Sequence, residues 1–181
     1  HSGQVGVATV PDERFDRLVD LYQPKKIVPT KIELFDTPGL SRDEKEGNAQ
    51  RLSVIREASV LVQVIGQFAG CDPTAEASAF IDDLILADSQ VVSNRVERLK
   101  KDAAKPRPDR DELQAELEAL LPIAERLENG DELADMEFSE AQVKAASSFA
   151  LLTRKRRLVV LNTADSDIDA EVVANLESAG H

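Results

Sequence analysis

A short acidic turn closes an apolar run near the start of the chain. Residues 31–40 read KIELFDTPGL, in which the run ends on Asp36 and Gly39 follows three residues later. A carboxylate after a strand can hold a magnesium ion through water, and the glycine lets a backbone N–H approach a terminal phosphate oxygen. The same residues also form an ordinary turn, with Asp36 as its first residue. Asp36 and Gly39 are therefore candidates for a magnesium and phosphate site.

A second polar stretch, Asn162-Thr163-Ala164-Asp165, follows the apolar run at residues 158–161. Asn and Asp at this spacing can place a carboxylate against the donor edge of a purine. Ligands of open α/β sheets bind at the carboxyl ends of the strands, so we expect Asp36 and Asn162 to lie at the same rim. The alternative is that Asn162 and Asp165 cap the helix expected after them. Each motif alone is common, and the two together favour a nucleotide site.

The rest of the composition excludes several other kinds of catalytic and metal site. The two histidines are the terminal residues, His1 and His181, which excludes Ser-His and Cys-His catalysis and histidine-ligated metals within this chain. The lone cysteine, Cys71, excludes an internal disulfide, indicates a reducing compartment and is expected to be a partly buried small residue. No apolar run approaches the ~20 residues of a bilayer span, and no signal-peptide pattern opens the chain. We expect a cytoplasmic protein without membrane contact.

The net charge of the 181-residue chain is −12, from 34 acidic and 22 basic residues. Such a surface repels polyphosphate at long range, so contact with nucleic acid must come from a local basic patch. Three candidates are Lys25-Lys26, residues 95–105 and residues 154–157. Each patch can equally be ordinary solvated surface.

The elements that must position these residues alternate along the chain. Strands are expected at residues 6–10, 31–36, 60–65 and 158–161, and helices at residues 12–22, 52–58, 139–152 and 165–178. The strand before Asp36 is expected to bury Ile32, Leu34 and Phe35. The run at residues 60–65 is almost continuously apolar, which is typical of a parallel strand buried on both faces. The alternation predicts an α/β sheet with helices on both faces.

A different pattern interrupts this alternation. Apolar residues keep a helical spacing from Ile81 to Leu99, a Pro-rich break follows, and a second helix is expected to begin after Asp109 as its cap and to kink at Pro122. Two apolar stripes joined by a short break predict an antiparallel helical hairpin. The expected division is a first part of one domain at residues 1–73, the hairpin at 74–135 and the second part of that domain at 136–181.

Several short motifs together resemble a known family. The chain reads VPDERFD at residues 10–16, PKKIVPT at 24–30 and DTPGL at 36–40, where the YchF subfamily of Obg-like GTP-binding proteins reads close to VPDERLD, PKK-VPT and D-AGL. The triplets IRE at 55–57, LAD at 86–88 and LLT at 151–153 follow in the same order. The resemblance covers the chain from Gly6 to about Asp167, and the VPDER block is specific to this subfamily.

The resemblance implies a P-loop NTPase domain, or G domain, with the helical hairpin inserted into it. By that similarity Asp36 contacts Mg²⁺ through water, Gly39 senses the γ-phosphate, and Asn162 and Asp165 shape the base pocket. Leu40 stands in the switch position where many GTPases carry a catalytic glutamine, so no catalytic side chain is assigned. The implied ligands are Mg²⁺ with GTP or ATP, and the implied partner is the ribosome or its RNA.

The chain departs from the family pattern in two informative ways. The phosphate loop, G-x-x-x-x-G-K followed by Ser or Thr, does not occur in these 181 residues, and the family carries it upstream of the matched region. We therefore expect the chain by itself to bind nucleotide weakly or not at all, because that loop supplies most phosphate contacts. The base motif ends in Asp165 where the family has Glu, which leaves GTP or ATP open with a lean to guanine.

Two other interpretations remain open from the sequence. In one, the protein is a non-enzymatic interaction module that uses the hairpin as a binding arm on a degenerate G-domain scaffold. In the other, the apolar stripe of the hairpin pairs in trans as a coiled coil, so that the chain associates with itself. The slow nucleotide hydrolase linked to translation is the interpretation that Asp36, Gly39, Asn162 and Asp165 favour.

Overall fold

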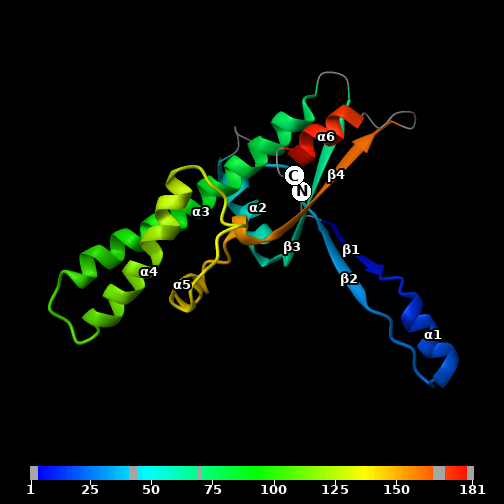
Figure 1. The fold of residues 1–181 in the computed structure, drawn as a ribbon, viewed down its shortest axis with the longest axis horizontal. Coiled ribbons are helices and arrows are strands. Elements are labelled where there is room, and N and C mark those ends of the chain that lie inside the picture. Colours follow the sequence, from blue (N-terminus) through cyan, green and yellow to red (C-terminus); the bar gives the residue numbers. More distant parts are fainter. Residues whose placement is uncertain (1–3, 41–44, 69–70, 165–169, 179–181) are drawn as a thin grey trace. The chain divides into compact units, whose positions relative to one another are not determined.

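The computed structural model describes residues 4–40, 45–68, 71–164 and 170–178 (Figure 1). The chain divides into two compact units, residues 1–44 and residues 45–181. Together they contain the α/β elements and the helical hairpin that the sequence predicts.

The first unit consists of two paired strands, with one helix between them in the sequence. Strand β1 (Gln4–Thr9) pairs antiparallel with β2 (Lys31–Asp36), and the register sets Gln4 opposite Asp36. Helix α1 (Glu13–Tyr22) begins after Asp12, whose carboxylate accepts a hydrogen bond from the Arg14 backbone N–H. This cap satisfies one of the free N–H groups of the first turn. The elements therefore form where the sequence predicts them.

The first unit has no buried residue in the described part, and here the sequence expectation was wrong. Ile32, Leu34 and Phe35 were expected to be buried, but each is half exposed, at 50%, 50% and 53%. Helix α1 likewise buries none of its residues. The reason is architectural: a two-stranded sheet and one short helix have too little surface to enclose a core of their own.

The second unit contains a parallel strand pair. Strands β3 (Val60–Gln67) and β4 (Arg156–Thr163) run in register from Val60 opposite Arg156 to Gln67 opposite Thr163. Burial along β3 alternates, with Leu61, Gln63 and Ile65 buried and Val62 and Val64 exposed. The prediction that this strand is buried on both faces was wrong, because within the described unit α3 (Pro73–Ala103) and α6 (Ala170–Ser178) pack against one face.

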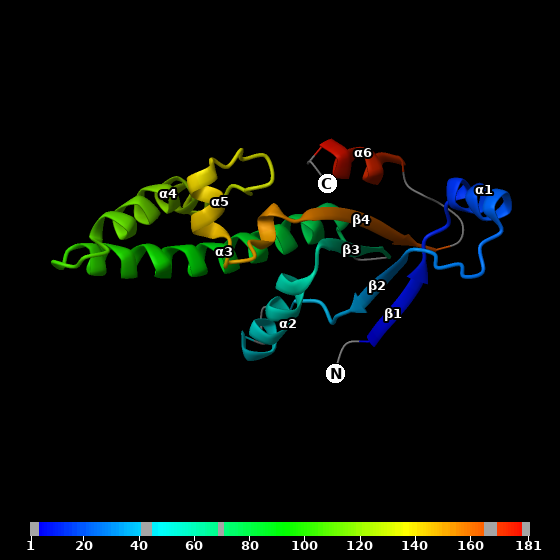
Figure 2. The same cartoon turned by 90° about the horizontal axis from the view of Figure 1, so that it is seen from below.

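The helical hairpin is present and antiparallel (Figures 1 and 2). Helix α3 begins after Asp72, which caps two backbone N–H groups, and has Pro73 as its first residue. Helix α4 (Arg110–Glu128) packs along its second half. Asp109 was expected to cap α4, but its carboxylate makes no cap hydrogen bond and instead pairs with Arg107. Helix α4 continues through Pro122.

The hairpin and the sheet have separate cores that share one helix. The larger core joins the second half of α3 to α4 and α5 (Glu140–Ala146), through Val92, Val96, Leu99, Leu117, Leu120 and Ile123. The smaller core joins the first half of α3 to β3 and α6, through Ile65, Ala77 and Leu176. The predicted three-part division stays a prediction, and α3 belongs to both packing regions. Among the described helices, none is long and apolar enough to cross a membrane.

Two helices differ from their expected lengths. Helix α5 has a capping box formed by Ser139 and Gln142, as the sequence suggested, but it ends at Ala146. The chain then passes through Ala150, in the left-handed region at φ 48°, and a short 3₁₀ helix, η1 (Leu152–Arg154), before β4. Helix α2 (Lys45–Glu57) begins earlier than expected.

Candidate functional site

Asp36 is the last residue of β2, at the end of the strand where the sequence predicted it. Its residue is exposed, and its carboxylate makes no hydrogen bond or ion pair with the part of the chain that the structure describes. The turn interpretation would give this carboxylate a nearby backbone N–H as partner. Among the described residues, therefore, no contact assigns the Asp36 carboxylate to holding its own turn.

Gly39 and Leu40 follow on the same segment. A methyl group built on Gly39 would meet no heavy atom within 4 Å, and the backbone does not adopt a left-handed conformation there. Neither packing nor backbone strain therefore requires a glycine at this position. Leu40 is partly buried. The alternative left for Gly39 is a role toward a ligand that needs to approach the backbone closely.

Asn162 lies near the end of β4, opposite Gly66 of β3. The side chain is exposed and has no hydrogen-bond partner among the described residues. The described part of helix α6 (Ala170–Ser178) is separated from Asn162 by residues outside the described part, Asp165 among them, so the helix-cap alternative stays a prediction. An added Cβ at the neighbouring Gly66 would lie 2.8 Å from the Phe68 ring, so that ring would have to shift.

The predicted site residues are not all placed together. Asp36, Gly39 and Leu40 belong to the first unit and Asn162 to the second, so their convergence on one nucleotide stays a prediction. Asp165 lies outside the described residues. What the structure gives is the position of Asp36 and Asn162 at the carboxyl ends of two strands, where open α/β sheets bind ligands.

The donor set at Asp36 fits a magnesium ion only as part of a nucleotide complex. Among the described residues, no group of three or more His, Cys, Asp or Glu side chains is arranged to hold a metal. Mg²⁺ is commonly bound through one or two carboxylates together with phosphate oxygens and water. The single carboxylate of Asp36 suits that mode and does not suit an independent metal centre.

The most elaborate polar cluster lies away from these residues, around Asp88 in the middle of α3. The Asp88 side chain is completely buried, and Arg56 at the end of α2 donates to its Oδ1 at 2.9 Å. Its Oδ2 accepts from both the backbone N–H and the hydroxyl of Thr153, at 2.9 and 3.0 Å. Every oxygen of this buried carboxylate is therefore paired, which is what burial of a charge demands.

Arg56 extends this cluster to the loop after α5. Its guanidinium also donates to the backbone carbonyls of Ala87, Phe149 and Ala150, at 3.1 to 3.2 Å. One side chain thus connects α2, α3 and the segment that leads into β4. Sequence analysis missed this cluster, although its members lie in the IRE, LAD and LLT triplets, whose shared presence was the available signal.

Lys155 adds a perturbed group next to this cluster. Its ammonium donates to the Ala58 carbonyl at 2.6 Å. Partial burial, followed by the positive charge of Arg56, lowers the pKa of Lys155 below its ordinary value, while the carboxylate of Asp88 acts in the opposite direction. Lys155 therefore loses its proton at a lower pH than a solvated lysine does.

Known proteins give a consistent comparison. The chain is 31% identical over 176 residues to the ribosome-binding ATPase YchF of Bacillus subtilis, covering 91% of this chain and 47% of that protein. It is 30% identical over 171 residues to Obg-like ATPase 1 of Oryza sativa subsp. indica, covering 87% and 43%. No family model matches. The solved structure of the Schizosaccharomyces pombe YchF GTPase matches with a TM-score of 0.77 and 27% identity, over 90% of this chain and 47% of that one.

The chain belongs to the YchF subfamily of Obg-like proteins. The match to the YchF GTPase structure confirms the predicted fold class, an α/β G-domain fold with an inserted helical hairpin. The chain spans about half the length of the curated YchF relatives it matches. The activity of a whole YchF protein is therefore proposed below rather than read from this chain.

Proposed function

We propose that this chain is part of a nucleotide-binding switch of the YchF type, which binds Mg²⁺ with GTP or ATP and hydrolyses it slowly. The observation that carries the proposal is the similarity to YchF relatives along 91% of the chain. The placement of Asp36 and Asn162 at strand ends supports it. The B. subtilis relative is named an ATPase and the S. pombe structure a GTPase, so both nucleotides are candidates.

Each candidate residue has a defined role in this proposal. Asp36 contacts the ion through a water molecule, and the backbone N–H of Gly39 contacts the terminal phosphate. Asn162 and Asp165 bind the base, and Leu40 occupies the switch position without acting as a base. Mg²⁺ neutralises charge that develops on the phosphates when it is bound.

The ribosome is the proposed partner. The B. subtilis relative carries ribosome binding in its name, and a protein that works on ribosomes would be cytoplasmic. The hairpin and the basic patches are the proposed contact regions. No single patch of the three is singled out by the comparisons.

A chimera tests the nucleotide proposal. Residues 4–178 would replace the matching part of the B. subtilis relative, so that the phosphate loop expected upstream in that family is supplied. Binding of fluorescent ATP and GTP would be titrated in the presence of Mg²⁺. We expect the chimera to bind nucleotide, and the 181-residue chain alone to bind far more weakly, because phosphate-loop N–H groups and lysine provide most phosphate contacts.

Matched variants make the outcome specific. In the chimera, Asp36→Ala and Asn162→Ala should each weaken nucleotide binding, and Glu33→Ala on the same strand should leave it unchanged. A chimera that keeps native circular dichroism and binds neither nucleotide would contradict the proposal. Micromolar binding by the chain alone would contradict the assigned need for the phosphate loop.

The interaction-module alternative rests on the hairpin. Its main apolar stripe, which includes Val92, Val96 and Leu99, is buried against α4 and α5 within the chain. Little of that stripe is left to pair with a second copy, so these contacts do not favour self-association. A hairpin that binds another partner without any nucleotide site would instead appear as a chimera that binds ribosomes and no nucleotide.

A further inference from the structure

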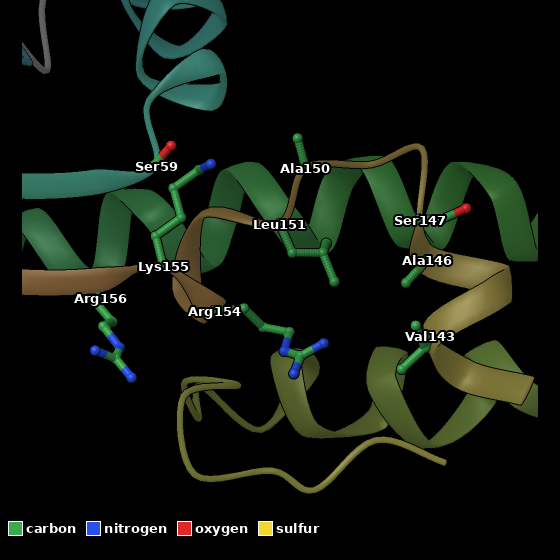
Figure 3. A pocket seen from close by; sticks show the side chains of 9 residues that line it. All are labelled: Ser59, Val143, Ala146, Ser147, Ala150, Leu151, Arg154, Lys155 and Arg156. Carbon is green, nitrogen blue, oxygen red and sulfur yellow. The ribbon is translucent and has the colours of Figure 1, made fainter. Parts of the chain in front are cut away.

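An open pocket of about 470 Å³ lies where α5, the loop after it and the start of β4 meet (Figure 3). Its apolar wall includes Val143 and Ala146 of α5. Its polar lining includes the hydroxyl groups of Ser59 and Ser147 and three consecutive basic residues, Arg154, Lys155 and Arg156. The pocket belongs entirely to the second unit.

Two arginines in this pocket have no acidic partner among the described residues. Arg154 and Arg156 are exposed, and neither makes an ion pair with any residue that the structure describes. Their neighbour Arg157 is different, because it pairs with Glu132 at 2.9 Å. Arg154 stacks on the Phe138 ring at 3.8 Å, which fixes its guanidinium plane while leaving its N–H donors available.

The two guanidinium groups extend to the same side of the chain. Figure 3 shows Arg154 and Arg156 directed one way and Lys155 the other way, toward Ser59. The backbone of Lys155 is extended and β4 begins at Arg156, and side chains two residues apart in an extended segment share a face. Arg154 and Arg156 therefore form a two-arginine face, while Lys155 is occupied by the Ala58 carbonyl.

The wall opposite is held in an unusual conformation. Ala150 lines the pocket with φ 48°, a region that costs energy for a residue with a side chain. Its carbonyl and that of Phe149 accept hydrogen bonds from Arg56, at 3.2 and 3.1 Å. Strained backbone that the surrounding contacts maintain is often found at binding sites. The Asp88 cluster thus sets the shape of the pocket.

The chemistry of the two-arginine face selects a phosphate group. Arginine binds phosphate oxygens with paired N–H donors, and the Ser59 hydroxyl can add a hydrogen bond, whereas the Ser147 hydroxyl already donates to the Lys144 carbonyl. The chain as a whole carries a net charge of −12, so free polyanions are repelled until they reach such a face. Small apolar side chains beside it, such as Ala146 and Val143, give a base or ribose a surface to contact.

We propose that this pocket binds the backbone of an RNA, with Arg154 and Arg156 each as the ligand of one phosphate. The inference rests on the proposed link to ribosomes, and it assigns that link to one place on the chain. The same phosphate chemistry occurs in free phosphate and in mononucleotides. Those small anions are the competing occupants.

Fluorescence anisotropy with a short labelled single-stranded uridine RNA tests the proposal on the full chain. Affinity would be measured from about 50 to about 200 mM salt for the native chain, for Arg154→Gln/Arg156→Gln, and for the control Arg17→Gln/Arg110→Gln. The control removes the same charge from two exposed arginines outside the pocket. Arg156→Gln alone is included, because Arg154 also packs on Phe138 and its loss can disturb folding.

We expect the pocket double variant to bind at least about tenfold more weakly, and the slope of log affinity against log salt to shrink by about 1.4, which is ~0.7 for each lost phosphate contact with single strands. Arg156→Gln alone should reduce the slope by about half of that amount. The control should keep the native slope. Native affinity in the pocket variants, or no RNA binding by the native chain at low salt, would overturn the proposal.

Competition distinguishes RNA from small anions. Inorganic phosphate and uridine monophosphate, added at matched ionic strength, should not displace the RNA at low millimolar concentration. Displacement would show that the pocket is a small-anion site and would overturn the RNA assignment. These measurements use the chain alone and not the chimera. An absence of RNA binding would therefore leave the nucleotide proposal intact, and an absence of nucleotide binding by the chimera would leave the RNA proposal intact.

Discussion

At the scale of residues, a distinctive feature is the buried carboxylate of Asp88, whose two oxygens both have hydrogen-bond partners within the chain. Asp88 has no exposed surface, and it is paired with Arg56 and Thr153, which lie 32 and 65 residues away in the sequence. The pair Arg95 and Glu116 is also short, at 2.7 Å, but it is partly solvated. Burial rather than distance distinguishes the two pairs energetically, because water screens the exposed one.

Removing Asp88 should cost much more stability than removing Glu116. We expect Asp88→Ala to lower the free energy of unfolding by about 3 kcal/mol, since it leaves the Arg56 charge without its counter-charge and the N–H and hydroxyl of Thr153 without their acceptor. Glu116→Ala should cost at most about 1 kcal/mol. Urea denaturation followed by circular dichroism measures both. Equal losses would show that the Asp88 cluster is not a stabilising unit.

Lys155 should titrate below an ordinary lysine. Its lowered pKa means that between that value and 10.5 the folded chain binds fewer protons than the unfolded chain, so its contribution to the free energy of unfolding rises with pH there. NMR titration of ¹³C-labelled lysine side chains measures the midpoint. Asp88→Asn should lower the pKa of Lys155 further, because the negative charge of Asp88 raises it. A rise in the variant would contradict this assignment.

Gly39 separates ligand binding from folding. Because a Cβ there meets nothing and the backbone is not left-handed, Gly39→Ala should leave the free energy of unfolding unchanged or raise it by about 0.4–1 kcal/mol. In the chimera the same variant should weaken nucleotide binding, since in the proposed site a phosphate approaches the Gly39 backbone closely and an added methyl group would obstruct it. Denaturation and nucleotide titration give the two readouts. Loss of stability without loss of binding would assign Gly39 to the fold instead.

At the scale of elements, local signals predicted much and packing decided the rest. Strand β2, helix α1 and the hairpin follow from caps, breaks and apolar spacing that are visible in the sequence. The exposed face of β3, by contrast, depends on which elements cover it, and an apolar run cannot specify that. The early end of α5 reflects the carbonyls that Arg56 binds, a contact between residues more than 90 positions apart.

The candidate site shows the same division. The positions of Asp36 and Asn162 at strand ends could be predicted from the sequence, because a polar residue after an apolar run is a local signal. The Asp88 cluster and the pocket at Arg154 had only indirect signals, in the short triplets and in a basic run. Their geometry arises from tertiary contacts between α2, α3 and the segment before β4.

The two units should differ in local stability. The described part of the first unit buries no residue, whereas α3 and α4 enclose many apolar side chains. Amide hydrogens of β1 and β2 should therefore exchange faster than those of α3 by several orders of magnitude. Hydrogen exchange followed by mass spectrometry gives this comparison within one sample. Equal protection would require burial of the first unit that its own contacts do not supply.

At the scale of the whole chain, charge sets how any RNA-containing partner is met. A net charge of −12 opposes association, and local arginines must outweigh it at short range. We expect the chain to co-sediment with ribosomes at low salt and to be released steeply as salt rises. Arg154→Gln/Arg156→Gln should shift that release to lower salt than Arg17→Gln/Arg110→Gln does. Absence of co-sedimentation at low salt would count against the ribosome as a partner of this region.

Helix α3 has a mechanical consequence that follows from where it is held. Asp88 lies at its midpoint, with fifteen residues on either side, and is pinned by Arg56 and Thr153. Each half therefore extends about 22 Å from this fixed point, and each packs in a different core. A tilt of about 5° would move the sheet end and the hairpin end by ~2 Å each, in opposite directions. A rigid helix held at its centre would thus convert a displacement of the sheet end into an equal and opposite displacement of the hairpin end.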